Sequence, residues 1–178
     1  ITLQLLKLFY ARFDPACHER DTLYPSLLIE TRQLVNSFNT GRRFLDELRR
    51  TVFNCAISFI HYGLKTNFFV PEKHALAFRL NPAYLEELGN EFTADLPNDR
   101  PFRITFFFGR RGSGYHIGFS DIARGGWRTL ITQGRDDYLT SANTLFRENY
   151  VLAHTQHLKN KDIYEGGSKL VAILNVDV

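Results

Sequence analysis

The sequence predicts an α/β fold, in which a helical N-terminal segment is followed by a mixed sheet with one long packed helix. Three observations support this prediction. Apolar residues recur at helical spacing before position 62. Two stretches between 102 and 119 alternate apolar with polar or small residues, as half-buried strands do. A helical period then runs over 136–160 and is followed by a short apolar run.

Residues 1–65 form the predicted helical segment. Its clearest helix covers 42–62 and carries apolar side chains at helical spacing: Phe44, Leu45, Leu48, Val52, Cys55, Ala56, Phe59 and Ile60. The second half of this helix is apolar on most sides, which predicts burial on more than one face. Gly41 precedes it, and Gly63 is the expected C-terminal cap. Residues 1–13 are expected to form a helix that stops before Pro15.

The pattern changes to short strands after Gly63. Residues 66–70 and 75–80 are predicted strands around a turn at Pro71, and a short helix is expected from Pro82. This part of the chain therefore opens the predicted sheet.

A predicted hairpin follows, with strands at 102–108 and 115–119. The glycine-rich stretch 109–114 between them superficially resembles a phosphate-binding loop. A phosphate-binding loop opens a helix, whereas this stretch precedes an alternating strand, so a turn is the preferred interpretation. The later helix, 136–160, has Leu139, Ala142, Leu145, Phe146, Leu152 and Ala153 on one side, and 170–176 is an expected buried strand.

Composition narrows the classes of function. The chain has 178 residues, of which 44% are hydrophobic and 23% charged, as in soluble globular proteins. A net charge of +3 argues against a dedicated nucleic-acid binder. No apolar run reaches the ~20 residues that cross a bilayer. Cys17 and Cys55 lack metal or redox spacing, so we expect buried free thiols, no metal site and a cytoplasmic location.

A pair of glycines, Gly125 and Gly126, is flanked by Arg124 and Arg128. Paired glycines let the backbone approach a ligand or another strand closely. A guanidinium group can hold a carboxylate with two hydrogen bonds. A bulge with two solvated arginines stays open as the alternative.

Three further polar residues lie near the end of the long helix. Gln156 and Lys159 are one turn apart on the same helical face. Lys169 follows Gly166 and Gly167 before the apolar strand, where a partly desolvated amine would suit proton transfer. Lysines also favour the last turn of a helix before a glycine stop, so a capping role stays open.

Taken in order, these segments resemble the large NAD-specific glutamate dehydrogenases of the amino-acid dehydrogenase superfamily. The resemblance rests on DIARGGWR, RDDY, QHLKN and EGGSK, with TNFF and ALAFRLNP upstream, and covers residues 66–178. It implies that 66–178 is a substrate-binding domain, truncated before a dinucleotide-binding domain, with NAD bound beyond Val178. L-Glutamate and 2-oxoglutarate are the implied ligands, and the full-length protein is expected to be a homo-oligomer.

The resemblance also implies a role for each site residue. The implied substrate-binding residues are Arg124, Gly125, Gly126, Gln156 and Lys159. Arg124 would bind the side-chain carboxylate of glutamate, and Lys159, assisted by Gln156, would hold the α-carboxylate. Lys169 would be the catalytic residue, which activates water and stabilises charge at the carbon under attack.

The sequence departs from the family after Lys169. Leu170 and Val171 stand where the family continues with glycines. The alternative interpretation is therefore a catalytically inactive regulatory or oligomerisation domain with the same fold. A relative that acts on leucine, valine or phenylalanine usually lacks a cation at the position of Arg124.

Overall fold

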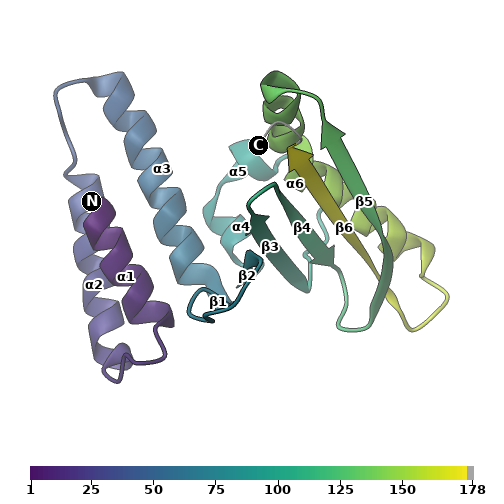
Figure 1. The fold of residues 1–178 in the computed structure, drawn as a ribbon, viewed down its shortest axis with the longest axis horizontal. Coiled ribbons are helices and arrows are strands. Elements are labelled where there is room, and N and C mark those ends of the chain that lie inside the picture. The colour runs from purple at the N-terminus through teal and green to yellow at the C-terminus, as the bar shows by residue number, and fades with distance from the viewer. Residues whose placement is uncertain (176–178) are drawn as a thin grey trace. The chain divides into compact units, whose positions relative to one another are not determined.

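Helices fill the first third of the chain and a mixed sheet with one long helix fills the rest, which confirms the α/β prediction (Figure 1). The structure is a computed structural model that describes residues 1–175. The chain divides into two units, Ile1–Gly63 and Leu64–Val178. Each unit has its own hydrophobic core.

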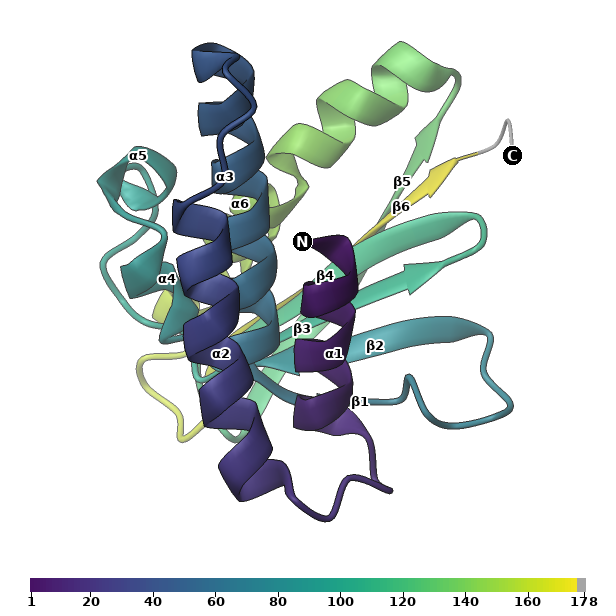
Figure 2. The same ribbon diagram turned by 90° about the vertical axis from the view of Figure 1, so that its left-hand side faces the viewer.

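Unit 1 consists of the helices α1 (Thr2–Phe13), α2 (Arg20–Asn36) and α3 (Arg43–Tyr62), which lie side by side (Figure 2). The predicted helices over 1–13 and 42–62 are confirmed. The core of the unit contains Leu8, Ala11, Tyr24 and Ile60, with Leu5, Phe9, Phe13, Leu27 and Leu28 packed against them. Burial of these apolar stripes holds the three helices together.

Several details of unit 1 differ from the prediction. In the first half of α3, Phe44 is 79% exposed, and Leu48 and Val52 are also exposed. Cys55 is exposed as well, whereas Cys17 is half-buried. Gly63 is no left-handed cap, because its φ of −64° and ψ of 124° are extended and begin a strand. A glycine is needed there for another reason, since a Cβ atom would overlap the ring of Phe13.

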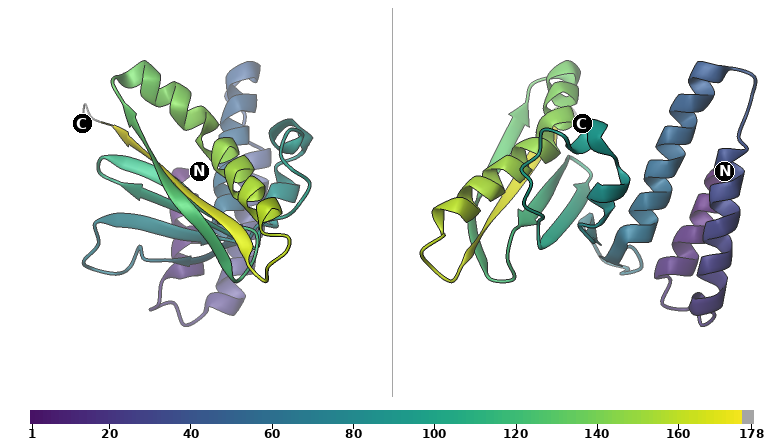
Figure 3. Two further views of the ribbon diagram at one scale, coloured as in Figure 1. Left: turned by 90° about the vertical axis from the view of Figure 1, so that its right-hand side faces the viewer. Right: turned by 180° about the vertical axis from the view of Figure 1, so that it is seen from behind.

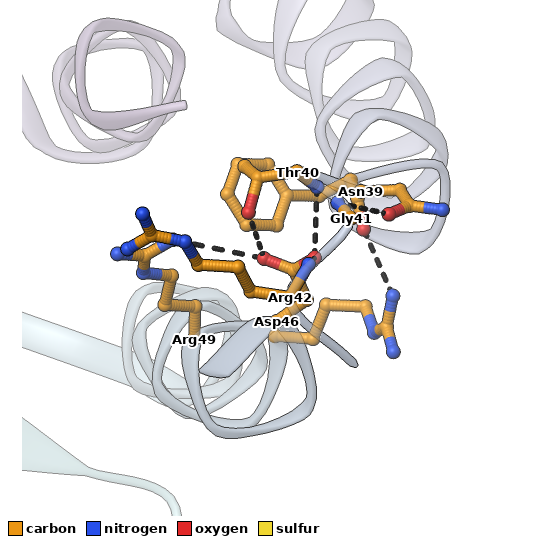
Figure 4. A network of polar contacts seen from close by, with 8 residues as sticks. Asn39, Thr40, Gly41, Arg42, Asp46 and Arg49 are labelled. Atoms are coloured by element: carbon orange, nitrogen blue, oxygen red, sulfur yellow. Dashed lines mark hydrogen bonds and ion pairs between the residues drawn. The ribbon is translucent and has the colours of Figure 1, made fainter. Parts of the chain in front are cut away.

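A buried carboxylate fixes the loop between α2 and α3 (Figure 4). Asp46, 1% exposed, accepts hydrogen bonds from the Thr40 hydroxyl at 2.7 Å and the Thr40 and Arg42 backbone N–H groups at 2.8 and 3.2 Å. Arg49 lies 3.6 Å from the same carboxylate. These N–H groups precede the first turn of α3, so Asp46 satisfies donors at its start. The Thr40 hydroxyl, followed by the backbone donors and Arg49, holds the pKa of Asp46 below its ordinary value.

Unit 2 is built on a sheet that has six strands within the described residues, in the order β1-β2-β3-β4-β6-β5. The strands are β1 (Gly63–Thr66), β2 (Ala75–Leu80), β3 (Arg103–Gly109), β4 (Gly112–Gly118), β5 (Ala123–Thr132) and β6 (Gly166–Asn175). The helices are α4 (Tyr84–Glu87), α5 (Asn90–Thr93) and α6 (Arg135–Lys159). β3 pairs antiparallel with β2 and β4, and β4 with β6, whereas β5 and β6 are parallel.

The parallel pair requires a crossover, and α6 provides it (Figure 3). The helix lies across one face of the sheet, where Leu145 packs against Val171 and Ile173 of β6. Tyr115, Leu130, Tyr138, Ala142 and Leu152 complete this core. The predicted helix over 136–160 is confirmed, but Leu139 near its start is 46% exposed.

Three strand predictions needed correction. The predicted strand over 66–70 is wrong, because β1 ends at Thr66 and the side chain of Asn67 closes a turn. Its amide donates to the carbonyl of Ala75 at 2.9 Å and accepts from the N–H of Ala77 at 2.7 Å. β5 was not predicted. β6 begins four residues before the predicted position 170, and the predicted end at Val176 lies outside the described residues.

The predicted hairpin is confirmed, with a tighter turn than expected. β4 begins at Gly112, so only Arg110 and Arg111 connect the strands. Along the part of the chain that the structure describes, no helix combines the length and apolar character needed to cross a membrane.

Candidate functional site

The pairing of β5 with β6 joins two of the segments that the sequence singled out. Arg124 lies opposite Gly167, and Gly126 opposite Lys169. Both glycine pairs therefore lie inside strands and not in loops. Because α6 connects these strands, its C-terminal end returns close to the beginning of both.

The glycines of β5 have two different neighbours. A Cβ atom on Gly125 would overlap the backbone carbonyl of Ser168 in the adjacent strand. A Cβ atom on Gly126 would lie 3.1 Å from Nζ of Lys169. The expectation of a close backbone approach is thus confirmed for Gly125, with a strand as the neighbour. At Gly126 the absence of a side chain leaves free space next to the Lys169 amine.

Arg124 is held by Asn160, the residue that ends α6. Its Nε and Nη2 donate to Oδ1 of Asn160 at 3.2 and 3.0 Å. Gln156 donates to the same oxygen at 3.4 Å, and Asn160 in turn donates to the carbonyl of Gly166 at 2.9 Å. Glu165 lies 3.6 Å from Nε of Arg124, whose side chain is 59% exposed. Arg124 is therefore oriented but still accessible.

The two lysines differ in their surroundings. Lys159 is exposed at the last residue of α6, where the negative end of the helix dipole favours a cation. Lys169 is half-buried in β6, opposite Ile117 of β4 and Gly126 of β5. Neither amine has a hydrogen-bond or ion-pair partner within residues 1–175.

The structure accordingly brings Arg124 and Gln156 together through Asn160, and Lys169 together with Gly126. Within the described residues, no hydrogen bond or ion pair joins the Lys159 side chain to the other predicted site residues. Lys159 enters the group only as the residue before Asn160.

Arg128 and the residues after Lys169 have structural roles. Arg128 forms an ion pair with Glu148 of α6 at 2.8 Å, so it is not a free substrate-binding group. Val171, where the family has glycine, is fully buried against α6. The departure from the family pattern at Val171 therefore contributes to the core of unit 2.

Sequence reasoning missed Asn160, Glu165 and His157. Nδ1 of His157 accepts a hydrogen bond from the N–H of Gly167 at 3.3 Å, and a Cβ on Gly167 would overlap the backbone of His157. An asparagine at the end of a predicted helix is a recognisable capping signal. The positions of Glu165 and His157 carry no such signal.

The N-terminus of α6 does not fit the phosphates of a dinucleotide. The N-terminus of α6 follows a strand, as a phosphate-binding helix does, but its first turn holds Asp136 and Asp137. The Asp137 carboxylate already accepts the backbone N–H of Gln133 at 3.0 Å. A phosphate there would meet like charge. Residues 1–175 also contain no group of three His, Cys, Asp or Glu side chains placed to hold a metal ion.

Comparison with known proteins supports the resemblance, although no protein-family model matches the chain. The chain is 41% identical over 132 residues to glutamate dehydrogenase 2 of Dictyostelium discoideum. It is 45% identical over 124 residues to the NAD-specific glutamate dehydrogenase of Neurospora crassa, and 45% over 112 residues to that of Saccharomyces cerevisiae. These matches cover 74%, 70% and 63% of the chain but only 12%, 11% and 10% of the relatives.

Proposed function

Because this chain belongs, as a segment, to the family of NAD-specific glutamate dehydrogenases, we propose that it forms the substrate-binding region of such an enzyme. Its ligands are L-glutamate and 2-oxoglutarate. The parent protein, an oxidoreductase and a cytoplasmic homo-oligomer in this proposal, deaminates glutamate oxidatively to 2-oxoglutarate and ammonia. NAD, which accepts the hydride in this chemistry, is bound by parts of the parent outside residues 1–175.

The observation that carries this proposal is the parallel register of β5 and β6. It sets Arg124, held by Asn160, two residues along the strand from Gly126, beside which the Lys169 amine lies. A dicarboxylate substrate needs separated cations that fix both of its ends. Arg124 keeps further N–H donors exposed for the side-chain carboxylate, and Lys159 serves the α-carboxylate.

Lys169 is the proposed catalytic residue. Because Gly126 has no side chain, nothing at that position separates the Lys169 amine from a ligand at this edge of the sheet. Once the hydride has left Cα, the substrate carbon is part of an iminium group. The neutral Lys169 amine accepts the proton of the water that adds to this carbon, and the electron pair of the C=N bond moves to the substrate nitrogen. The ammonium that results stabilises the negative charge that develops on the oxygen.

A substrate-selectivity measurement on the full-length parent tests the proposal. Arg124→Leu should lower kcat/KM for glutamate. The loss should correspond to about 1.5–3 kcal/mol of transition-state binding, the range of one charged hydrogen bond. Turnover of norvaline, which lacks the side-chain carboxylate, should change little. The control is Arg110→Leu in the exposed hairpin turn. An unchanged ratio of glutamate to norvaline turnover in Arg124→Leu would remove Arg124 from the substrate site.

One observation favours an inactive regulatory or oligomerisation domain as the second candidate. Glu165 already places a carboxylate near Arg124, where the substrate carboxylate would bind. A purified parent that reduces no NAD with glutamate would favour this candidate. Glutamate-dependent reduction would exclude it.

A further inference from the structure

The face of the sheet opposite α6 carries a cluster of cationic side chains in unit 2. Tyr115 and Phe119 of the hairpin contact α6 residues, so the alternating residues of β4 point to the other face. On that other face, β4 presents His116, β3 presents Arg103 and Thr105, and β2 presents Arg79. Lys169 lies opposite Ile117 and so belongs to the α6 side.

The strand register places these four residues around one point. Arg79, Thr105 and His116 lie directly opposite one another on β2, β3 and β4. With strands ~4.8 Å apart, Thr105 stands midway between the two cationic residues. Arg103 lies on the diagonal to both, at roughly 7–8 Å between backbones, within reach of long side chains.

Arg103 lies beside this point, and its guanidinium is anchored beyond the end of β4. Its Nη2 donates to the carbonyl of Ser120 at 2.9 Å and also to that of Asp121. Its side chain crosses Gly118, where a Cβ atom would lie 3.3 Å from both Cγ and Nε. The absence of a side chain on Gly118 therefore admits the arginine.

The cluster has unused donors. The Nε atoms of Arg79 and Arg103 are both buried without a hydrogen-bond acceptor. Within residues 1–175, no carboxylate forms an ion pair with Arg79 or His116, and the Thr105 hydroxyl has no hydrogen bond. Arg103 differs, because the pKa of Asp121 is lowered chiefly by the N–H of Ile122 and in part by the charge of Arg103. Such unsatisfied buried donors are rare in native proteins and call for an acceptor.

The positive charges of the cluster also act on one another. Burial, followed by the charge of Arg103, lowers the pKa of Arg79. Burial, followed by the charges of Arg103 and Arg79, lowers the pKa of His116. All three side chains therefore lie close enough to repel one another, and an anion between them would relieve that repulsion.

We propose that Arg79, Thr105 and His116, with the charge of Arg103 beside them, form a binding site for a phosphate group on the face of the sheet opposite α6. A guanidinium fork, a hydroxyl and an imidazole in one row across three strands can donate to a tetrahedral oxyanion, which offers acceptors in several directions. A carboxylate offers acceptors in one plane only. This site lies on the opposite face from Lys169, so it goes beyond the proposed substrate site.

Titration calorimetry on the 178-residue chain tests this site, with inorganic phosphate and glycerol phosphate as probes and acetate at equal ionic strength as the comparison. We expect saturable phosphate binding that shifts the NMR signals of the His116 ring. A preference for glycerol phosphate would identify a phosphomonoester as the ligand, and a preference for inorganic phosphate the free ion. Arg79→Gln should weaken binding at least about tenfold, the loss expected for one charged hydrogen bond.

Two further variants complete the test. Thr105→Val removes only the central hydroxyl and should also weaken binding, whereas Arg110→Gln, in the hairpin turn outside the cluster, should bind as the wild type does. Arg79→Gln should remain folded by circular dichroism, because the Arg79 side chain makes no hydrogen bond or ion pair in the described structure. Absence of saturable binding, equal affinities in Arg79→Gln and wild type, or equal binding of acetate would each overturn the proposal.

Discussion

The guanidinium group of Arg124 donates two hydrogen bonds to a single oxygen of Asn160, from Nε at 3.2 Å and from Nη2 at 3.0 Å. The amide nitrogen of Asn160 donates to the carbonyl of Gly166 at 2.9 Å, and the residue is only 2% exposed. One buried amide thus joins β5, the end of α6 and the start of β6. Asn160 is therefore a positioning residue for Arg124.

Asn160→Ala should lower the free energy of unfolding of the 178-residue chain by about 1–3 kcal/mol. The carbonyl of Gly166 loses its donor, and Arg124 loses its acceptor. Chemical denaturation of the variant and the wild type measures the difference. Lys161→Ala, an exposed neighbour, is the control and should change the unfolding free energy little.

Asn160→Asp separates the structural role of the residue from its positioning role. The carboxylate keeps an acceptor for Arg124 but removes the donor to Gly166. In the full-length parent, Asn160→Ala should raise KM for glutamate. Asn160→Asp should bring KM back toward the wild-type value, although its free energy of unfolding stays low. If KM instead followed stability in both variants, Asn160 would have no role beyond folding.

The two glycines of β5 should respond differently to the same substitution. In Gly125→Ala the new methyl group would overlap the Ser168 carbonyl, so the β5–β6 pairing must shift at a cost of about 3 kcal/mol, the upper end for overpacking. In Gly126→Ala the methyl would meet only the flexible end of Lys169. Its effect on unfolding should stay below about 1 kcal/mol. Thermal unfolding of both variants tests this difference.

The same pair of variants reports on the site in the full-length parent. Gly126→Ala should lower kcat, because its methyl displaces the Lys169 amine while the fold persists. Normal activity in a folded Gly126→Ala parent would mean that the space beside Lys169 is not used by the substrate.

The Asp46 carboxylate should make the stability of unit 1 depend on acid pH. Its pKa is lowered in the folded state from an ordinary value of 3.8, chiefly by the Thr40 hydroxyl. The folded state therefore binds the proton less tightly, and the stabilisation is complete above pH 3.8 and is lost as pH falls through the lowered value. Asp46→Asn should thus be less stable than wild type at pH 7, with a difference that shrinks on acidification below 3.8. An unfolding difference that does not depend on pH would contradict this account.

Periodicity predicted the elements whose burial is regular. The helix α3, the hairpin of β3 and β4, and α6 were each predicted within a few residues, because one face of each is apolar at the period of the element. β5 was missed because Gly125 and Gly126 weaken a strand signal, and this strand forms through its pairing with β6. The early start of β6 was missed for the same reason, since Gly166 and Gly167 lie under Ser120 and His157.

The sequence predicted the cationic residues of the candidate site, but it did not predict Asn160, which orients Arg124. Arg124, Gln156 and Lys169 could be named because charged residues beside glycines are visible in the sequence. Asn160 and Glu165 act through contacts between residues far apart in sequence or across a turn, which no local pattern encodes. The exposure of Phe44 likewise could not be predicted, because helical spacing does not tell which apolar positions find partners.

The proposed division of labour between Lys159 and Lys169 is the central claim. Lys159, exposed at the end of α6, would grip a carboxylate in both the ground state and the transition state, so Lys159→Ala should mainly raise KM. Lys169, beside Gly126, would act chiefly in the transition state. Lys169→Ala should therefore lower kcat by roughly 10²–10⁴-fold, the range of general acid–base catalysis, with little change in glutamate affinity.

The measurement is steady-state kinetics of both variants in the full-length parent, with glutamate affinity measured by calorimetry and Lys161→Ala as the exposed-lysine control. We expect a KM effect in Lys159→Ala, a kcat effect in Lys169→Ala and neither effect in the control. Equal losses of kcat in the first two variants would contradict the division of labour, and full activity in Lys169→Ala would contradict the catalytic assignment itself.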